Sequence, residues 1–117
     1  MIKQVKVGGI TYGISLVPVI EINGSRNYSG LFKANDAQLE IIEAMSDDRK
    51  NEILIHELTH AIAYEAHVDM DEDSVIQFSK VLNQVLQDND FGWLKRDKPM
   101  LELFAEGHSI GKTILKV

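Results

Sequence analysis

The 117-residue chain has no cysteine, so neither a disulfide nor a thiolate metal ligand is available to it. Any transition metal must therefore be held by histidine, aspartate or glutamate. Basic residues are also scarce, because 12 lysines and arginines face 18 aspartates and glutamates and leave a formal net charge of −6. Nucleic-acid binding depends on surplus positive charge to neutralise phosphates, so we expect no nucleic-acid partner.

Long apolar runs are missing as well. No stretch approaches the roughly 20 apolar residues that span a bilayer, so no membrane association is expected. The N-terminal residues alternate between apolar and polar, and Gly8, Gly9 and Gly13 interrupt the next segment, which argues against a signal peptide. We therefore expect a cytoplasmic protein.

The length and composition predict one domain. Hydrophobic residues make up 44% of the chain and charged residues 26%, as in ordinary globular proteins. A chain of this length builds one core without disulfides. Within this single domain, 1–117, we expect a sheet in 1–45, two helices in 46–90 and a C-terminal tail in 91–117.

Four segments near the N-terminus have the pattern of β-strands: Gln4–Val7, Ile10–Val17, Tyr28–Ala34 and Gln38–Ile42. The glycine pair between the first two predicts a hairpin. Asn35 and Asp36 predict a turn between the last two. The segment Gln38–Ile42 is also compatible with the start of a helix, but the turn before it and the helix start after it favour a strand.

The segment from Ser46 to about Ala66 has the features of an α-helix. Ser46 is a capping residue, and Asp47 and Asp48 place negative charge at the positive end of the helix dipole. The middle of the segment is apolar nearly all the way round, which is typical of a buried helix. The apolar residues are Ile53, Leu54, Ile55, Leu58, Ala61, Ile62 and Ala63.

This helix contains the motif H-E-x-x-H, from His56 to His60. Histidines four residues apart leave the same helix face, which is the geometry two imidazoles need to hold one zinc ion. Glu57 is placed to accept a proton from a metal-activated water that attacks a carbonyl. The alternative is a helix with two unrelated surface histidines and a surface glutamate. However, polar groups in a buried helix are costly unless they are paired or metal-bound.

A second helix is expected from about Glu72 to Gln87, after a short polar connection that favours an antiparallel helix pair. Its apolar residues recur at three- and four-residue spacing, which predicts packing against the first helix. They are Val75, Phe78, Val81, Leu82, Val85 and Leu86. The expected fold class is therefore α+β, with a small antiparallel or mixed sheet of about four strands followed by two packed antiparallel helices that carry the metal site.

A catalytic zinc site needs three protein ligands, and the third has several candidates. His67 follows His60 by seven residues and lacks the six-residue spacing and the glycine of the metzincin pattern. Asp71 is expected to cap the second helix and Asp73 to face water. Glu72 has the longer reach at the edge of the apolar stripe, so we choose it. The predicted ligands are His56, His60 and Glu72, and other residues that could contact the metal or its ligands are His67, Asp71, His108 and Tyr64.

The motif helix and the pattern Glu72-x-x-Val75-x-x-Phe78-Ser79 resemble the small zincin-like metallopeptidases encoded by phages and mobile elements. These are similar to the minigluzincins and more distantly to the ImmA/IrrE family. The resemblance covers about residues 28–90 and implies a sheet, then the motif helix, then a helix whose glutamate is the third ligand. Further motifs of the ImmA/IrrE family are absent, so its regulatory role is not implied.

Together these features predict a zinc-dependent metallopeptidase with Zn²⁺ as cofactor and a peptide or protein as substrate. We expect the substrate to add as a strand to an exposed sheet edge formed by Gln38, Leu39, Glu40, Ile41 and Ile42. Candidates for stabilising the oxyanion are Tyr28, Tyr64, Arg26 and His108. The alternative is a protein-binding module of phage origin in which zinc only stabilises the fold. A nuclease or amidase with the same zinc chemistry is a third option, and the negative charge counts against a nucleic-acid substrate.

Overall fold

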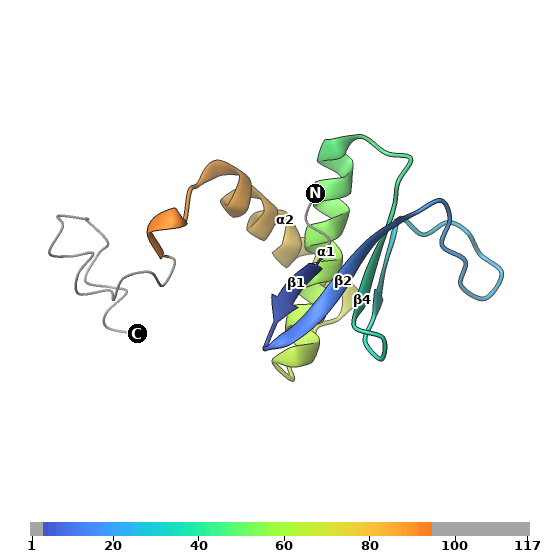
Figure 1. The fold of residues 1–117 in the computed structure, drawn as a ribbon, viewed down its shortest axis with the longest axis horizontal. Helices are drawn as coiled ribbons and strands as arrows, with labels where there is room; N and C mark the ends of the chain where they lie inside the picture. Colours follow the sequence, from blue (N-terminus) through green and yellow to red (C-terminus); the bar gives the residue numbers. More distant parts are fainter. Residues whose placement is uncertain (1–3, 95–117) are drawn as a thin grey trace, which may run out of the picture. The chain divides into compact units, whose positions relative to one another are not determined.

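The computed structural model describes residues 4–94 of the chain (Figure 1). The chain divides into two units, Met1–Gln87 and Asp88–Val117. The described elements are β1 (Gln4–Val7), β2 (Ile10–Val17), β3 (Gly30–Lys33), β4 (Gln38–Ile42), α1 (Asp47–Glu65), α2 (Glu72–Asp88) and a short 3₁₀ helix, η1 (Gly92–Leu94). All but η1 and the last residue of α2 belong to the first unit. The α+β class is confirmed, and the third strand is shorter than the expected Tyr28–Ala34.

The four strands form one mixed sheet in the order β1-β2-β4-β3. β1 and β2 are antiparallel and are joined by the expected hairpin, in which Gly8 and Gly9 have φ values of 58° and 86°. β4 runs parallel to β2 on one side and antiparallel to β3 on the other. The prediction that Gln38–Ile42 is an exposed edge is therefore wrong, because both sides of β4 are already hydrogen-bonded. The edge strand on this side of the sheet is β3.

The core lies where α1 packs on the sheet, against β1, β3 and β4. Tyr12 of β2, Leu39 of β4 and Ala61 of α1 are fully buried, and Val7 of β1 is 7% exposed beside them. Partly buried apolar residues surround them: Val5, Ile14, Phe32, Ala37, Leu54 and Leu58. The side chains of α1 that face the sheet therefore fix where this helix lies relative to β3.

Ser46 begins α1 as expected, since its side-chain oxygen accepts a hydrogen bond from the backbone N–H of Arg49 at 3.2 Å. α1 ends at Glu65, and the next two residues leave the helix, with His67 in a left-handed conformation at φ 57°. The composition of α1 suggested a helix buried on all sides, but part of its surface is exposed. Ile62 is 41% exposed, because the sheet covers only one face.

The apolar stripe of α2 is buried only near the start of the helix. Val75 and Ser79 are buried and lie on the same helix face as Glu72, three and seven residues further on. Phe78 and Val81 are 55% and 62% exposed. The prediction that the whole stripe packs against the first helix is therefore wrong, because only the first two turns of α2 face the rest of the unit. Within residues 4–94, no helix is both long and apolar enough to cross a membrane.

Candidate metal centre

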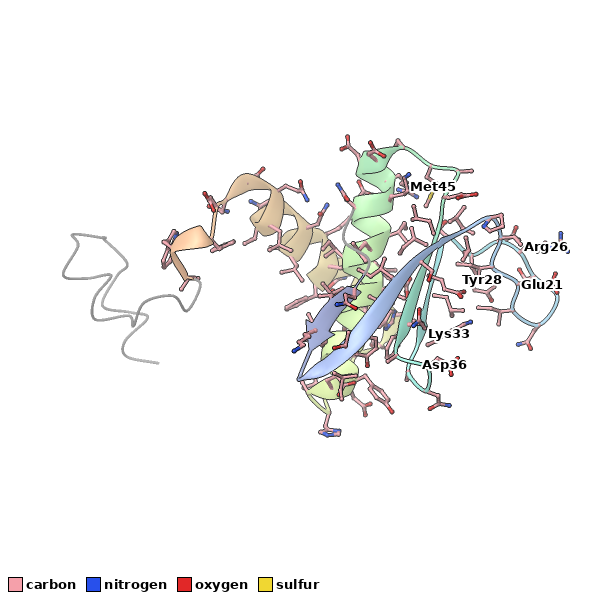
Figure 2. All side chains as sticks on the ribbon, viewed as in Figure 1. Glu21, Arg26, Tyr28, Lys33, Asp36 and Met45 are labelled. Atoms are coloured by element: carbon pink, nitrogen blue, oxygen red, sulfur yellow. The ribbon has the colours of Figure 1, made fainter. Side chains whose placement is uncertain are left out.

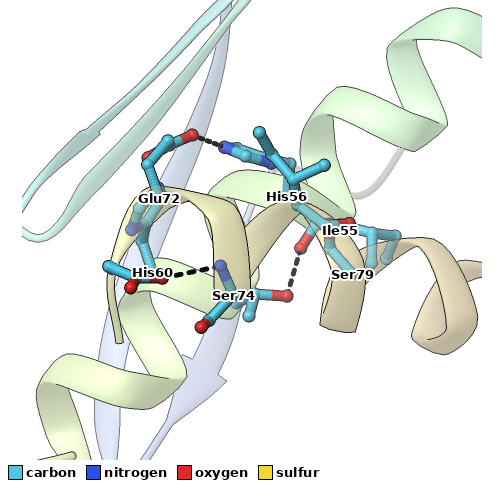
Figure 3. Close-up of polar contacts among 9 residues, drawn as sticks. Ile55, His56, His60, Glu72, Ser74 and Ser79 are labelled. Carbon is cyan, nitrogen blue, oxygen red and sulfur yellow. Dashed lines mark hydrogen bonds and ion pairs between the residues drawn. The ribbon is translucent and has the colours of Figure 1, made fainter. Parts of the chain in front are cut away.

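Three side chains from the two helices meet at one point. The Nε2 atom of His56 lies 2.8 Å from one carboxylate oxygen of Glu72, and the Nε2 atom of His60 lies 3.1 Å from the other (Figure 3). One possible ligand atom from each residue lies within 4.8 Å of the other two. Within residues 4–94, this is the one group of histidine and acidic side chains close enough to share a metal ion.

The spacing of these atoms suits a small divalent ion. Nitrogen and oxygen ligands at about 2.0–2.1 Å from a tetrahedral zinc ion lie about 3.3 Å from one another. The two histidine–glutamate distances of 2.8 and 3.1 Å are shorter by only a few tenths of an ångström. The side chain of Glu72 is 60% exposed, so the group is open to solvent.

Helix geometry and one cap place these ligands. His56 and His60 leave the same face of α1, and their ring centroids are 5.0 Å apart. Asp71 precedes α2 and its carboxylate accepts a hydrogen bond from the backbone N–H of Ser74 at 2.8 Å. Hydrogen bonds from the side chain and from the backbone of Ser74 lower the pKa of Asp71, and the backbone bond caps the first turn of α2. Glu72, the first residue of the helix, is thereby directed at the two imidazoles.

Glu57 differs from the ligands in being buried, with only 8% of its surface exposed. Burial raises the pKa of its carboxyl to about 7, and the negative charge of Glu72 acts in the same direction. The edge strand packs closely against Glu57, since Gly30 of β3 lies directly against the glutamate side chain. A carboxylate held in such a place is suited to take up and release protons near neutral pH.

Aromatic side chains pack beside His60. The rings of Phe32 and His60 are stacked with centroids 6.3 Å apart and planes 3° from parallel, and Tyr64 meets Phe32 edge-on at 5.6 Å. Burial lowers the pKa of His60; the charge of His56 acts in the same direction, while Glu72 opposes both. A histidine kept neutral is ready to ligate a metal.

The other candidates lie elsewhere. His67 is exposed beyond the end of α1 and is not in the ligand group. Asp71 serves as the helix cap, as expected. Arg26, in the loop between β2 and β3, is paired with Glu21 at 2.8 Å (Figure 2). His108 lies outside the described residues.

The tyrosine candidates are both on the surface. Tyr28 is 41% exposed in the loop that leads to β3, where Figure 2 labels it. Tyr64 is 52% exposed and its ring contacts that of Phe32, which in turn stacks on His60. Among the described candidates, Tyr64 is therefore the one connected to the histidines.

Sequence reasoning overlooked two residues beside the group and a third that bonds the end of α1. Gly30 and Phe32 of β3 contact Glu57 and His60 respectively. The hydroxyl of buried Tyr12 donates a 2.5 Å hydrogen bond to Glu65, at the last turn of α1. Alternation along the strand could have shown that residues 30 and 32 share a face. Only the sheet order shows which helix that face meets.

A scan against protein-family models, a search of curated proteins and a search of solved structures each find no match to this chain.

Proposed function

We propose that the protein is a zinc-dependent metallopeptidase of the zincin type, as its motifs suggest by resemblance. The observation that carries the proposal is the meeting of two imidazoles and one carboxylate, from helices separated by a short connection, beside a buried glutamate. Two neutral nitrogen donors and one carboxylate are a typical catalytic zinc set, in which the fourth position is left for water or substrate.

The residues divide the chemistry between them. His56, His60 and Glu72 would hold the ion, which when bound supplies a Lewis acid for the substrate carbonyl and lowers the pKa of a water in the open position. Glu57 is one residue from a ligand but is turned inward. Its carboxylate accepts a proton from the attacking water and then passes it to the leaving amine nitrogen, as a general base followed by a general acid.

The edge strand β3 replaces β4 as the expected platform for substrate. Within the described residues, β3 pairs only with β4, so its other side has free backbone donors and acceptors. An extended peptide can add to such an edge by main-chain hydrogen bonds. Because Gly30 and Phe32 of β3 contact Glu57 and His60, a peptide on this edge would pass close to both.

The test is cleavage of a peptide library by the zinc-loaded protein and by two variants. E57Q removes the base while leaving the ligands, and we expect cleavage to fall by about 10²–10⁴-fold. E52Q changes an exposed glutamate of the same helix, whose side chain is 53% exposed, and should cleave as the wild type does. Equal cleavage by E57Q and the wild type would exclude Glu57 as the base.

The exposed apolar residues of α2 favour a second candidate, a protein-binding module whose zinc only stabilises the fold. Phe78 and Val81 are more exposed than apolar residues of a packed helix usually are. This second candidate predicts that the wild type and E57Q both bind zinc and are both stabilised by it, and that neither cleaves any peptide. Cleavage by the wild type alone decides for the peptidase.

A further inference from the structure

Gly30 occupies the point where the edge strand comes closest to the buried glutamate. A Cβ atom built at Gly30 would lie 2.5 Å from Cγ2 of Ile53, 2.9 Å from Oε2 of Glu57 and 3.0 Å from Cγ of Glu57. Real Cβ atoms essentially never come so near another heavy atom. Among the described glycines, positive φ values occur at Gly8, Gly9 and Gly24 but not at Gly30. The backbone there would accept any residue, so the glycine is needed for space and not for conformation.

The other helix-facing residue of β3 prevents α1 from moving away. Side chains two apart on a strand share a face, so positions 30 and 32 both face α1. Phe32 is half-buried, and its ring stacks on that of His60. A helix that backed away from a larger residue at position 30 would lose this stacking and the burial of Phe32. Any added side chain must therefore displace Glu57 or Ile53.

We propose that Gly30 is a positioning residue for Glu57: its missing side chain leaves the space that the glutamate carboxylate needs beside the two histidines. This inference rests on the proposed function for its effect on catalysis, but not for its effect on the position of the carboxylate. Misplacing a catalytic group by about 1 Å typically costs about 10²-fold in rate. The three atoms nearest to the added Cβ belong to Ile53 and Glu57, and none of them belongs to a metal ligand.

The first experiment compares Gly30→Ala with Gly13→Ala, a matched control in β2. Gly13 also lacks a positive φ, and a Cβ there would lie 2.5 Å from Nε2 of Gln38, the far end of a flexible side chain that can turn away. Zinc affinity is measured by competition with a chromophoric chelator, and kcat and KM with a peptide that the wild type cleaves. We expect G30A to lose about 100-fold in kcat with KM and zinc affinity unchanged, and G13A to match the wild type.

A second variant separates the two crowded neighbours and guards against a failure of G30A to fold. Ile53→Ala removes the Cγ2 atom that gives the closest contact, so G30A/I53A relieves that clash and keeps the one with Glu57. The loss of kcat, measured against I53A alone, should persist in the double variant. Restoration of kcat to the I53A value would overturn the proposal, since the contact with Ile53 would then be the cause. A G30A enzyme with wild-type kcat would overturn it as well.

Crystal structures of zinc-loaded wild type and G30A/I53A give a readout that needs no activity. We expect the Glu57 carboxylate to be displaced by about 1 Å or more in the double variant, with His56, His60 and Glu72 unmoved. If the wild type cleaves nothing and the carboxylate is displaced, the proposed function fails while the role of Gly30 stands. A carboxylate in its original place overturns the role of Gly30, whether or not the protein is a peptidase.

Discussion

Replacing Glu57 with glutamine should make the metal-free protein more stable at neutral pH, although the same change should remove its activity. The buried carboxyl has a pKa of about 7 instead of the ordinary 4.5, because burial and the charge of Glu72 disfavour its ionised form. The folded protein therefore holds a proton at Glu57 that the unfolded chain releases. Stability is lost as the pH rises from about 4.5 to about 7, and the loss is complete above that range.

The size of the effect can be worked out from the two pKa values. At about 1.4 kcal/mol for each tenfold change in proton affinity, the difference between 4.5 and about 7 corresponds to about 3 kcal/mol above neutral pH. A glutamine at position 57 has the same shape and no charge, so it avoids this cost at every pH. E57Q should exceed the wild type in stability by up to about 3 kcal/mol at pH 8 and by nothing below about pH 4.5.

The assay is urea unfolding followed by circular dichroism at several pH values, with a chelator present because a bound cation would lower the pKa of Glu57 again. Comparing E57Q with the wild type separates the pH dependence of stability that is due to Glu57 from that due to His60. The lowered pKa of His60 acts in the opposite direction, adding stability as the pH rises. E52Q is the control and should stay within about 0.5 kcal/mol of the wild type throughout. A difference between E57Q and the wild type that does not change with pH would refute the reasoning.

Three further variants test one metal ligand and two hydrogen bonds that stabilise α1. H60A removes a metal ligand itself, so it should weaken zinc binding by more than the roughly 10–100-fold that is lost when only a hydrogen-bond partner of a ligand is removed. It should also abolish the rise in Tm that zinc causes, measured by calorimetry. An unchanged rise would place the ion elsewhere. Tyr12 is buried and its pKa is raised to about 12 by burial and by Glu65, so Y12F, which leaves the acceptor on Glu65 without its donor, should cost about 1–3 kcal/mol in urea unfolding. S46A removes the cap that binds the N–H of Arg49 and should cost about 1 kcal/mol in the same measurement, with zinc affinity unchanged.

Much of the local structure could be predicted from the order of residues. The bounds of β1, β2 and β4, the hairpin at Gly8 and the cap at Ser46 all agree with the expectation. Each depends on neighbours within a few residues, through side-chain alternation, turn conformation or capping. The shared direction of His56 and His60 is of the same kind, since it depends on the helical repeat alone.

The order of the strands could not be predicted in this way. β4 was expected at an edge, but the chain returns to place it between β2 and β3, so that β3 has the free side. Local alternation does not specify which strands become neighbours, because pairing between distant segments depends on how the whole sheet buries its apolar face. For that reason Gly30 and Phe32 could not be connected to Glu57 and His60 in advance.

The amino-acid sequence alone was enough to define the local elements and to place two histidines and a glutamate on one helix, because spacing along a regular helix fixes direction. Glu72 was also chosen from the sequence as the partner of the two histidines, and the packing of the helices brings its carboxylate to both imidazoles. Two features came only from the packing of the folded chain: Glu57 is buried against the edge strand, and Phe78 and Val81 of α2 are exposed. Each of these depends on the angle and distance at which separate elements pack. Those quantities are set by contacts between residues far apart in the chain, which no local pattern contains.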